Sequence, residues 1–233
     1  MIDLLPGEIV ESLNIKDYKI IQSSALYKFT SDSVLLSRFA RGGAESVCDI
    51  CAGSGIVSLH YFALNDTSVK KAVAVELQSS LAKMCQKSVD LNGLGGVFTV
   101  ENVPLQEYKA ANAFDLVLCN PPYEKAGASI PPKDEHLALC KTEAGVTLED
   151  IVSCAKRILK VGGRFVICHK SARLAELITL LDKYKLNPSR LGFVSGKGEK
   201  AYLVLCEAIK GKKEDLEVYN TVINDFTDFS GEK

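Results

Sequence analysis

The four residues Asn120-Pro121-Pro122-Tyr123 combine a carboxamide, a rigid double proline and an aromatic ring. The two prolines fix the backbone φ angles and remove two N–H donors, so the carbonyl groups of the turn point outward. The Asn120 side-chain oxygen and the Pro121 carbonyl can then accept the two hydrogens of an amino group, and Tyr123 offers a flat face for stacking. This pattern favours chemistry at the nitrogen of a planar amine or amide. Positioning and electrostatics would replace a strong general base.

A second polar segment, Asp49-Ile-Cys-Ala-Gly-Ser-Gly55, follows a short apolar run. Glycines let the backbone turn tightly and approach a ligand, and the start of the next helix supplies free N–H groups. Glu76 ends the following apolar run, where a carboxylate can accept both hydroxyls of a ribose. We therefore predict a site for a nucleoside-containing cofactor. A nicotinamide-dependent reductase is disfavoured, because its fingerprint needs a glycine at position 58, where the sequence has Ser58.

These residues must be positioned by alternating strands and helices. Apolar runs predict strands over 46–51, 70–77, 97–102, 113–119 and 164–168, and a terminal hairpin over 190–195 and 201–208. Helical periodicity predicts helices after the glycine loop and over 79–92, 148–160 and 172–184. The alternation implies an α/β fold with a mostly parallel sheet, helices on both faces and an antiparallel strand in the hairpin. Because ligands bind at the carboxyl ends of parallel strands, Asn120 is expected beside the glycine loop.

Composition suits one packed domain: 233 residues, 47% hydrophobic, with a formal net charge of -1. We expect a single domain over 1–233, with a lead-in segment over 1–45 and an acidic tail over 214–233. No stretch of about 20 apolar residues is present to span a membrane, and the amino terminus lacks the basic residues of a secretory signal. We expect a cytoplasmic protein with no obligate protein partner, no metal site, and eight cysteines that are reduced and mostly buried.

Charge is unevenly distributed along the chain. Residues 1–150 carry a net charge of -6, residues 151–213 carry +10, and the last 20 residues carry -5. A basic segment of this size can attract a polyanion, although solvated lysines on helix faces would give the same composition.

Asn-Pro-Pro-Tyr is similar to the signature of class I methyltransferases that act on the amino group of adenine or the amide of glutamine. Further stretches narrow the match: Phe29-Thr-Ser-Asp32-Ser-Val-Leu-Leu-Ser37, Thr147-Leu-Glu-Asp150, Gly162-Gly-Arg-Phe-Val-Ile-Cys-His169 and Arg190-Leu-Gly-Phe-Val. From about residue 18 to residue 209 the chain resembles the bacterial tRNA-Val (adenine-N(6))-methyltransferase family, whose members modify an adenosine beside the anticodon. The resemblance implies a Rossmann-like class I fold with a seven-stranded sheet.

The resemblance also implies S-adenosyl-L-methionine as the cofactor and assigns roles by position. Catalytic residues would be Asn120, Pro121, Pro122 and Tyr123. Cofactor-binding residues would be Ser31, Asp32, Asp49, Cys51, Gly53, Gly55, Glu76, Leu77, Asn102, Val103 and Asn120. Asp49 would meet the methionine end of the cofactor, and Asp32 would help to close the pocket there.

The sequence departs from the family pattern at three places. Thr30 and Ser31 stand where the pattern before Asp32 reads Gly-Thr, so a tight glycine position is lost. Pro104 takes the position expected for an acid that binds the cofactor's adenine amine, so Asn102 or a backbone group is expected to substitute. Glu124 follows the tyrosine where an aromatic residue is common.

A target nucleotide within tRNA must leave its stack while basic groups hold the flanking backbone. The +10 segment supplies the expected RNA-binding residues, which are His169, Lys170, Arg173, Arg190 and Lys197. Charge reversal at Arg173 and Arg190 is expected to weaken tRNA binding.

Three alternatives share parts of this pattern. A glutamine-N(5) methyltransferase of peptide-release factors has the same motif but carries a helical domain ahead of the glycine loop, and only 48 residues precede Asp49. A DNA adenine methyltransferase would need a recognition domain, for which the residues after the last strand leave no room. A catalytically inactive RNA-binding protein with the same fold stays open.

Overall fold

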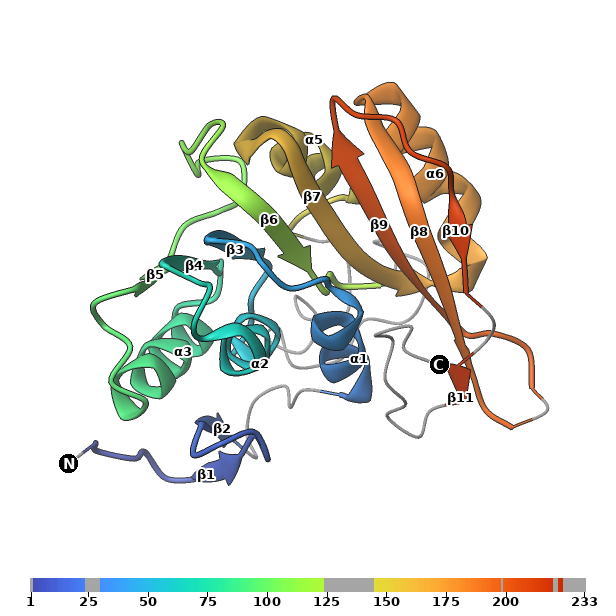
Figure 1. Ribbon diagram of the computed structural model, residues 1–233. Coiled ribbons are helices and arrows are strands. Elements are labelled where there is room, and N and C mark those ends of the chain that lie inside the picture. Colours follow the sequence, from blue (N-terminus) through green and yellow to red (C-terminus); the bar gives the residue numbers. More distant parts are fainter. Residues whose placement is uncertain (1, 24–29, 124–144, 198, 220–221, 224–233) are drawn as a thin grey trace.

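The computed structural model describes residues 2–23, 30–123, 145–197, 199–219 and 222–223. Its central strands are β3 (Ser46–Ile50), β4 (Lys71–Val75), β5 (Phe98–Glu101), β6 (Phe114–Cys119), β7 (Leu159–Lys170), β8 (Leu186–Ser195), β9 (Leu203–Lys210), β10 (Glu217–Val218) and β11 (Val222–Ile223). Within these residues they form one nine-stranded sheet in the order β10-β8-β9-β7-β6-β3-β4-β5, with β11 also paired to β8 (Figure 1).

The seven predicted strands correspond to β3 through β9. The five strands β7, β6, β3, β4 and β5, taken in their order in the sheet, pair in parallel. Strand β9 is antiparallel to both of its neighbours, β7 and β8. The predicted mostly parallel sheet with a terminal antiparallel hairpin is therefore confirmed. The two-residue strands β10 and β11, which come from the acidic tail, extend it beyond β8.

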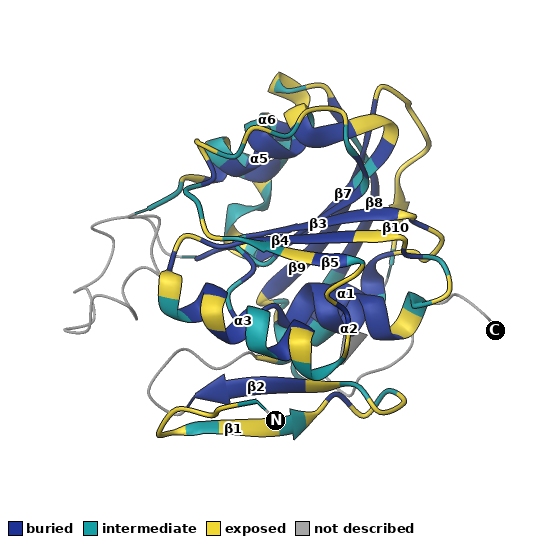
Figure 2. Cartoon of the chain, turned by 90° about the vertical axis from the view of Figure 1, so that its left-hand side faces the viewer, coloured by how far each residue is buried: buried dark blue, intermediate teal, exposed yellow. Residues whose placement is uncertain are grey.

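Helices cover the sheet on two sides, as Figure 2 shows edge-on. The helices α1 (Ser31–Phe39), α2 (Ile56–Asn65) and α3 (Ser79–Leu91) lie on one face, and α5 (Leu148–Ile158) and α6 (Leu174–Lys183) lie on the other. A single 3-10 turn, η1 (Ser171–Arg173), precedes α6. Within the described part of the chain, no helix is both long and apolar enough to cross a membrane.

The two-sided cover explains why the strands read as continuous apolar runs. Successive side chains of a strand point to opposite faces, so β3 places Val47 in the core beneath α1 to α3 and places Cys48 and Ile50 in the core beneath α5 and α6. All eight residues of β9 are buried for the same reason. Such burial on both faces holds the carboxyl ends of β3, β4 and β6 at one rigid edge.

The lead-in segment contains a hairpin that periodicity did not predict. Strands β1 (Glu8–Ser12) and β2 (Lys19–Ser23) pair antiparallel and form a further layer outside α2 and α3 (Figure 2). Ile21 packs with Leu81 and Met84 of α3, and its N–H donates to Ser88 Oγ at 2.9 Å. This layer holds α3 from the side away from the sheet.

The predicted and observed element boundaries differ most around Gly162 and Gly163. The predicted helix over 148–160 ends at Ile158, and β7 starts directly at Leu159. Gly162, with φ +79°, lies inside an irregularity of the β6–β7 ladder, so the strand includes the double glycine that was predicted to precede it. At the other end of α5, Thr147 and Asp150 form a reciprocal capping box, which fixes where the helix begins.

Candidate active site

The glycine loop joins β3 to α2 through three residues with positive φ: Cys51 at 60°, Gly53 at 57° and Gly55 at 85°. A Cβ on Gly55 would lie 2.4 Å from Cys85 Sγ, so packing against α3 requires glycine there. A Cβ on Gly53 would meet no heavy atom within 4 Å among the described residues. Gly53 therefore faces open space on the side where a ligand would approach.

Glu76 follows β4 and closes the loop from the opposite side. Its two carboxylate oxygens accept hydrogen bonds from the backbone N–H groups of Gly53 and Gln78, each at 2.8 Å. The side chain is 7% exposed, and burial raises its pKa although these bonds lower it. Each oxygen keeps a lone pair, so the carboxylate is fixed in place and can still accept hydroxyl groups.

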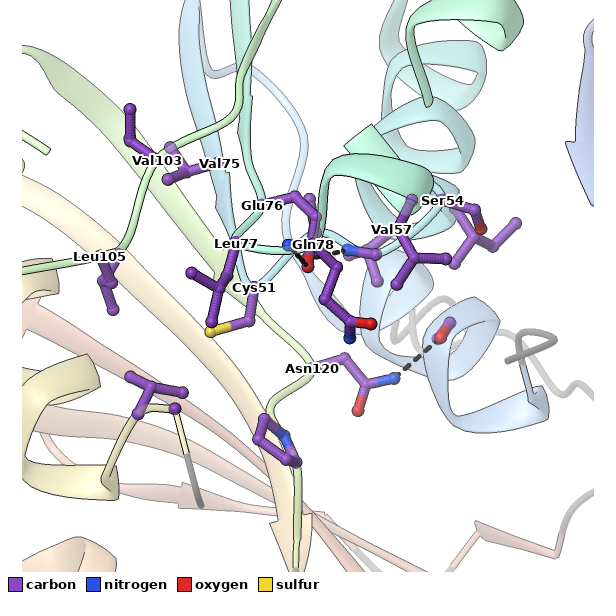
Figure 3. Close-up of a pocket in the computed structure, with 18 residues that line it drawn as sticks. Cys51, Ser54, Val57, Val75, Glu76, Leu77, Gln78, Val103, Leu105 and Asn120 are labelled. Atoms are coloured by element: carbon purple, nitrogen blue, oxygen red, sulfur yellow. Dashed lines mark hydrogen bonds between the residues drawn. The ribbon is translucent and has the colours of Figure 1, made fainter. Parts of the chain in front are cut away.

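These groups open onto one cavity, shown in Figure 3. It is lined by Ser33, Cys51, Ala52, Gly53, Ser54, Ile56, Val57, Val75, Glu76, Leu77, Gln78, Leu81, Val103, Leu105, Asn120, Pro122, Gly145 and Val146. The predicted residues Cys51, Gly53, Glu76, Leu77, Val103 and Asn120 are thus brought together. Leu77 is 42% exposed, so the cavity presents an apolar side chain that the folded chain leaves uncovered.

Asp49 lies behind the loop and does not line the cavity. Its Oδ2 accepts from the Ser58 N–H at 3.1 Å and from the Ser58 hydroxyl at 2.8 Å, whereas its Oδ1 has no hydrogen-bond partner among the described residues. Complete burial raises its pKa to about 7. Ser58, where a dinucleotide site would have glycine, therefore anchors the head of the loop.

Asn102 departs from its predicted role. Its amide nitrogen donates to the carbonyl oxygens of Glu76 at 2.8 Å and Leu77 at 3.0 Å, and it does not line the cavity. Both amide hydrogens are consumed in tying the end of β5 to the end of β4. The expectation that the Asn102 side chain substitutes for the acid that binds the adenine amine is wrong, because this side chain lies outside the cavity, which the adjacent Val103 and Leu105 line instead.

Asn120 is held at both ends of its carboxamide. Its nitrogen donates to Ser33 Oγ at 2.8 Å (Figure 3). Its oxygen accepts from the Tyr123 hydroxyl at 2.7 Å and from the Cys168 thiol at 3.1 Å. Ser33 and Cys168 were not predicted, because they lie far from Asn120 in sequence. Their contacts exist only once α1 and β7 pack around the end of β6.

Tyr123 points its hydroxyl into the protein. The oxygen lies 2.7 Å from Asn120 Oδ1 and 3.2 Å from Asp32 Oδ2, and the single hydroxyl hydrogen can serve one acceptor at a time. Its ring lies 5.4 Å from the ring of His169, centroid to centroid. Burial raises the pKa values of Tyr123 and Asp32, so the phenol stays protonated and the carboxyl is a weaker acid than usual.

A second hollow lies next to the first cavity, and neighbouring residues of two segments line the two spaces. Asp32 and Tyr123 line it, while their neighbours Ser33 and Pro122 line the first cavity. The other residues that line it are Lys170, Ser171, Ala172, Tyr202 and Leu203. Asn120 and Pro122 therefore line the first cavity on the side where Tyr123 leads to the second hollow. Pro121 is buried beside them, and Ser31, at the start of α1, lines neither hollow.

The RNA-binding role predicted for Arg190 and His169 is wrong, because both side chains are buried. Arg190 is 2% exposed: its guanidinium carbon lies 4.3 Å from the Phe39 ring centre and its Nη1 lies 3.5 Å from an oxygen of the fully buried Glu207. His169 is also buried, and its Nδ1 accepts the Lys170 N–H at 2.8 Å. Burial, followed by the charge of Arg173, lowers its pKa to about 4, so it is neutral near pH 7.

The other three predicted residues lie near the second hollow or on its rim. Lys170 lines the hollow, and Lys197 is exposed in the loop between β8 and β9. Arg173 is 10% exposed at its side chain and pairs with Glu176, one turn along, at 2.5 Å. Arg173 is therefore largely engaged within α6, and Lys197 is the exposed cation among these three residues.

The described cysteines are free thiols. Cys48, Cys85, Cys119, Cys154, Cys168 and Cys206 are buried, and Cys51 is half-buried at the cavity. Burial raises the pKa of Cys154 to about 11, so this thiol is protonated near pH 7. Glu124 lies outside the described residues.

Comparison with known proteins gives one family match and several relatives. The sequence model of the methyltransferase small domain matches residues 30–185. The chain is 27% identical over 173 residues to a tRNA1(Val) (adenine(37)-N6)-methyltransferase of Aeromonas hydrophila, covering 74% of this chain and 72% of that protein. It is 24% identical over 211 residues to the enzyme of the same name from Tolumonas auensis, covering 89% and 87%.

Solved structures share the fold at low sequence identity. A predicted O-methyltransferase from Agrobacterium tumefaciens superimposes with a TM-score of 0.59 at 18% identity, over 82% of this chain and 85% of that chain. The TYW2 protein of P. horikoshii in complex with MeSAdo gives 0.62 at 14% identity, over 88% and 72%. These neighbours establish the class I methyltransferase architecture described above.

Proposed function

Because the chain belongs to the methyltransferase small domain family, we propose that it transfers a methyl group from S-adenosyl-L-methionine to the N6 nitrogen of an adenosine in tRNA. That the chain is a methyltransferase follows from the family. The observation that carries the finer proposal is the Asn120-Pro121-Pro122-Tyr123 corner, which lies where two hollows meet. The names of the relatives support tRNA as the substrate and an adenosine beside the anticodon, at position 37, as the target.

The first cavity fits S-adenosyl-L-methionine in three respects. Gly53 leaves room beside the loop, Glu76 offers fixed acceptors for ribose hydroxyls, and Leu77 with its neighbours offers an apolar wall for a purine. When bound, the cofactor supplies a methyl group activated by its bond to a positively charged sulfur. The buried, unpaired Oδ1 of Asp49 supports the prediction that Asp49 acts from beneath the loop on the methionine end.

The chain activates the amino group by holding its hydrogens. Adenine's exocyclic nitrogen is a poor nucleophile because its lone pair is delocalised into the ring. Asn120 Oδ1 and the Pro121 carbonyl can accept its two hydrogens and favour a pyramidal nitrogen with a free lone pair. Once the nitrogen carries positive charge, its proton is acidic enough to leave without a strong base.

For this to happen, Asn120 Oδ1 must release a hydrogen bond. Its oxygen now accepts from both Tyr123 and Cys168. The Tyr123 hydroxyl can turn its hydrogen to Asp32 Oδ2, 3.2 Å away, without moving its ring. When the target amine arrives, Asp32 would accept the hydrogen bond that the Tyr123 hydroxyl now donates to Asn120. Asp32 would in this way help to orient the Asn-Pro-Pro-Tyr turn.

The second hollow suits the target base and its backbone. Tyr123 and Tyr202, the latter 42% exposed, offer aromatic surface on which an unstacked base can lie. Lys170 stands at the same hollow and supplies a cation for a flanking phosphate. The single domain, the cytoplasmic location and the independence from a protein partner stay predictions.

The proposal is tested by identifying the methylated product. The protein is incubated with methyl-labelled donor and bulk tRNA, and the digested nucleosides are separated. We expect label in N6-methyladenosine. The Asn120→Ala variant should lose transfer by about 100-fold or more, while affinity for S-adenosyl-L-homocysteine stays within about threefold.

Two outcomes would contradict it. Label in another nucleoside would refute the target atom, and wild-type turnover in Asn120→Ala would refute the mechanism. A parallel reaction with a peptide-release factor tests the rival substrate, since label in its glutamine and none in tRNA would favour that family instead.

A further inference from the structure

The segment after β5 meets the cofactor cavity only through apolar side chains. Val103 and Leu105 line the cavity, and they face a wall completed by Val75, Leu77 and Val146. Leu77 is 42% exposed although its side chain is large and apolar. Such a surface gains free energy by covering the faces of a purine, but it offers no partner to the groups on the purine's edge.

Every polar side chain that lines the cavity, among the described residues, comes from elsewhere. They are Ser33, Cys51, Ser54, Glu76, Gln78 and Asn120, from α1, the glycine loop, the end of β4 and the end of β6. In Figure 3 the Gln78 carboxamide lies on the Asn120 side of the cavity, away from Val103 and Leu105. When the cofactor is bound, these groups would face its ribose and its reacting end rather than the purine.

The two residues best placed to supply an acceptor do not do so. The Asn102 side chain does not line the cavity, because its amide nitrogen donates to the carbonyl oxygens of Glu76 and Leu77 and holds the side chain there. Pro104 has no N–H, its ring carries no polar atom, and its carbonyl accepts from the Glu107 N–H at 2.9 Å. No described side chain on this segment therefore faces the edge of the purine with a hydrogen-bond acceptor.

We propose that this pocket binds the purine of its cofactor without reading the 6-amino group through a side chain, so that nucleosides altered at position 6 bind about as well. This inference rests on the proposed function, because it needs the cofactor in this cavity. A site rejects an analogue strongly when a buried polar group would be left unpaired. The described residues place no such side chain on the wall, so we expect replacement of the amine to carry little penalty.

Isothermal titration calorimetry on the full chain measures this directly. The ligands are S-adenosyl-L-homocysteine, its N6-methyl derivative and S-inosyl-L-homocysteine, which carries a 6-oxo group. We expect the three dissociation constants to agree within about threefold.

A variant that adds an acceptor to the apolar wall should distinguish the 6-amino ligand from the 6-oxo ligand. Val103 lines the cavity, so Val103→Asp places a carboxylate on the wall, and Val103→Ala is the matched control that shortens the side chain without adding an acceptor. The Asp variant should prefer the 6-amino ligand over the 6-oxo ligand by about tenfold, because a charged acceptor strengthens the hydrogen bond, and the Ala variant should show no preference.

The outcomes separate this inference from the proposed function. If S-adenosyl-L-homocysteine binds but either analogue binds about 30-fold more weakly or worse, the inference is overturned and the function stands. A Val103→Asp variant without preference would show that this wall does not face the edge of the purine, which also overturns the inference. Failure of all three ligands to bind overturns the cofactor assignment and the inference together.

Discussion

At the scale of single residues, the orientation of the Asn120 carboxamide is the central feature. Ser33 accepts from its nitrogen, and Tyr123 and Cys168 donate to its oxygen. Three partners from α1, β7 and the turn itself therefore decide which end of the amide faces the reacting nitrogen. An amide held this way needs no reorganisation when the target arrives, apart from the hydroxyl of Tyr123.

The hydroxyl of Tyr123 competes with the target amine for Asn120 Oδ1, while its ring supplies stacking. Tyr123→Phe removes the competitor and keeps the ring, so kcat/KM should stay within about threefold of wild type, whereas Tyr123→Ala should lose about tenfold or more because a stacked base contributes about 1–3 kcal/mol. Steady-state methylation of tRNA measures both variants. Equal losses in the two variants would show that the hydroxyl itself is required.

Asp49 makes stability depend on pH. Its pKa is raised from 3.8 to about 7 by burial, so between these values the folded chain holds a proton that the unfolded chain has released. The contribution of Asp49 to the free energy of unfolding is greatest below about pH 4. It falls as the pH rises towards 7, by up to about 1.4 kcal/mol per pH unit.

Asp49→Asn removes this dependence and keeps an oxygen for Ser58. The free energy of unfolding of the variant minus that of wild type should therefore increase from about pH 5 to about pH 7, by about 1 kcal/mol or more. Urea denaturation at these pH values measures the difference. A difference that stays constant would show that Asp49 is charged throughout.

At the scale of elements, the glycine loop uses its two glycines for different purposes. In Gly53→Ala the new methyl group meets no described atom, so stability should fall only by the cost of positive φ, about 1–2 kcal/mol. In Gly55→Ala the same cost is joined by a Cβ placed 2.4 Å from Cys85 Sγ.

Thermal unfolding should therefore rank Gly55→Ala below Gly53→Ala. Calorimetry should show that Gly53→Ala loses affinity for S-adenosyl-L-homocysteine, because its methyl group stands in the cavity. Equal melting temperatures for the two variants would contradict the packing argument, and unchanged affinity in Gly53→Ala would contradict the assignment of the loop.

Periodicity predicted the elements of the sheet well and the outer layer poorly. Strands such as β6, buried on both faces, and a capped amphipathic helix such as α5 leave strong local patterns. The β1–β2 hairpin leaves a weak pattern, because β1 is mostly exposed and β2 is buried by side chains of distant helices, such as Leu81 and Met84 of α3. Its pairing depends on a helix that forms about 60 residues later in the chain.

At the scale of the whole molecule, the basic segment divides between two ends of the sheet. The carboxyl ends of β7 and β8 carry Lys170, Lys197 and Lys200 to the rim near the second hollow. The start of β7 and the end of β9 carry Lys160, Lys210, Lys212 and Lys213 to the opposite edge. The prediction that this segment grips RNA therefore applies to the rim lysines alone.

Charge reversal separates the two ends. Lys197→Glu with Lys200→Glu should weaken tRNA binding about tenfold or more at low salt and reduce the slope of log affinity against log salt by about 2. Lys212→Glu with Lys213→Glu, the matched control, should leave both within error. Fluorescence anisotropy with labelled tRNA measures them, and equal effects in the two pairs would refute a specific rim.

Arg190 shows why charge in a sequence does not reveal its role. Its guanidinium carbon lies 4.3 Å from the Phe39 ring centre and 5.2 Å from the Tyr219 ring centre, and its Nη1 donates to the Phe39 carbonyl and faces buried Glu207. Glu207 also lies within 4.0 Å of Arg41 and Arg164. These partners come from α1, β7, β9 and the segment after β10, so the arginine joins distant elements and is withdrawn from any ligand.

The sequence alone determined the order of elements, the glycine loop and the Asn-Pro-Pro-Tyr turn, because each is written in neighbouring residues through periodicity and backbone restriction. Tertiary structure alone decided that Ser33 and Cys168 hold Asn120, that Asn102 turns away from the cavity, and that Arg190 and His169 are buried. Those outcomes depend on which surfaces meet after the sheet forms. Burial and hydrogen bonding between distant residues are properties of the packed chain.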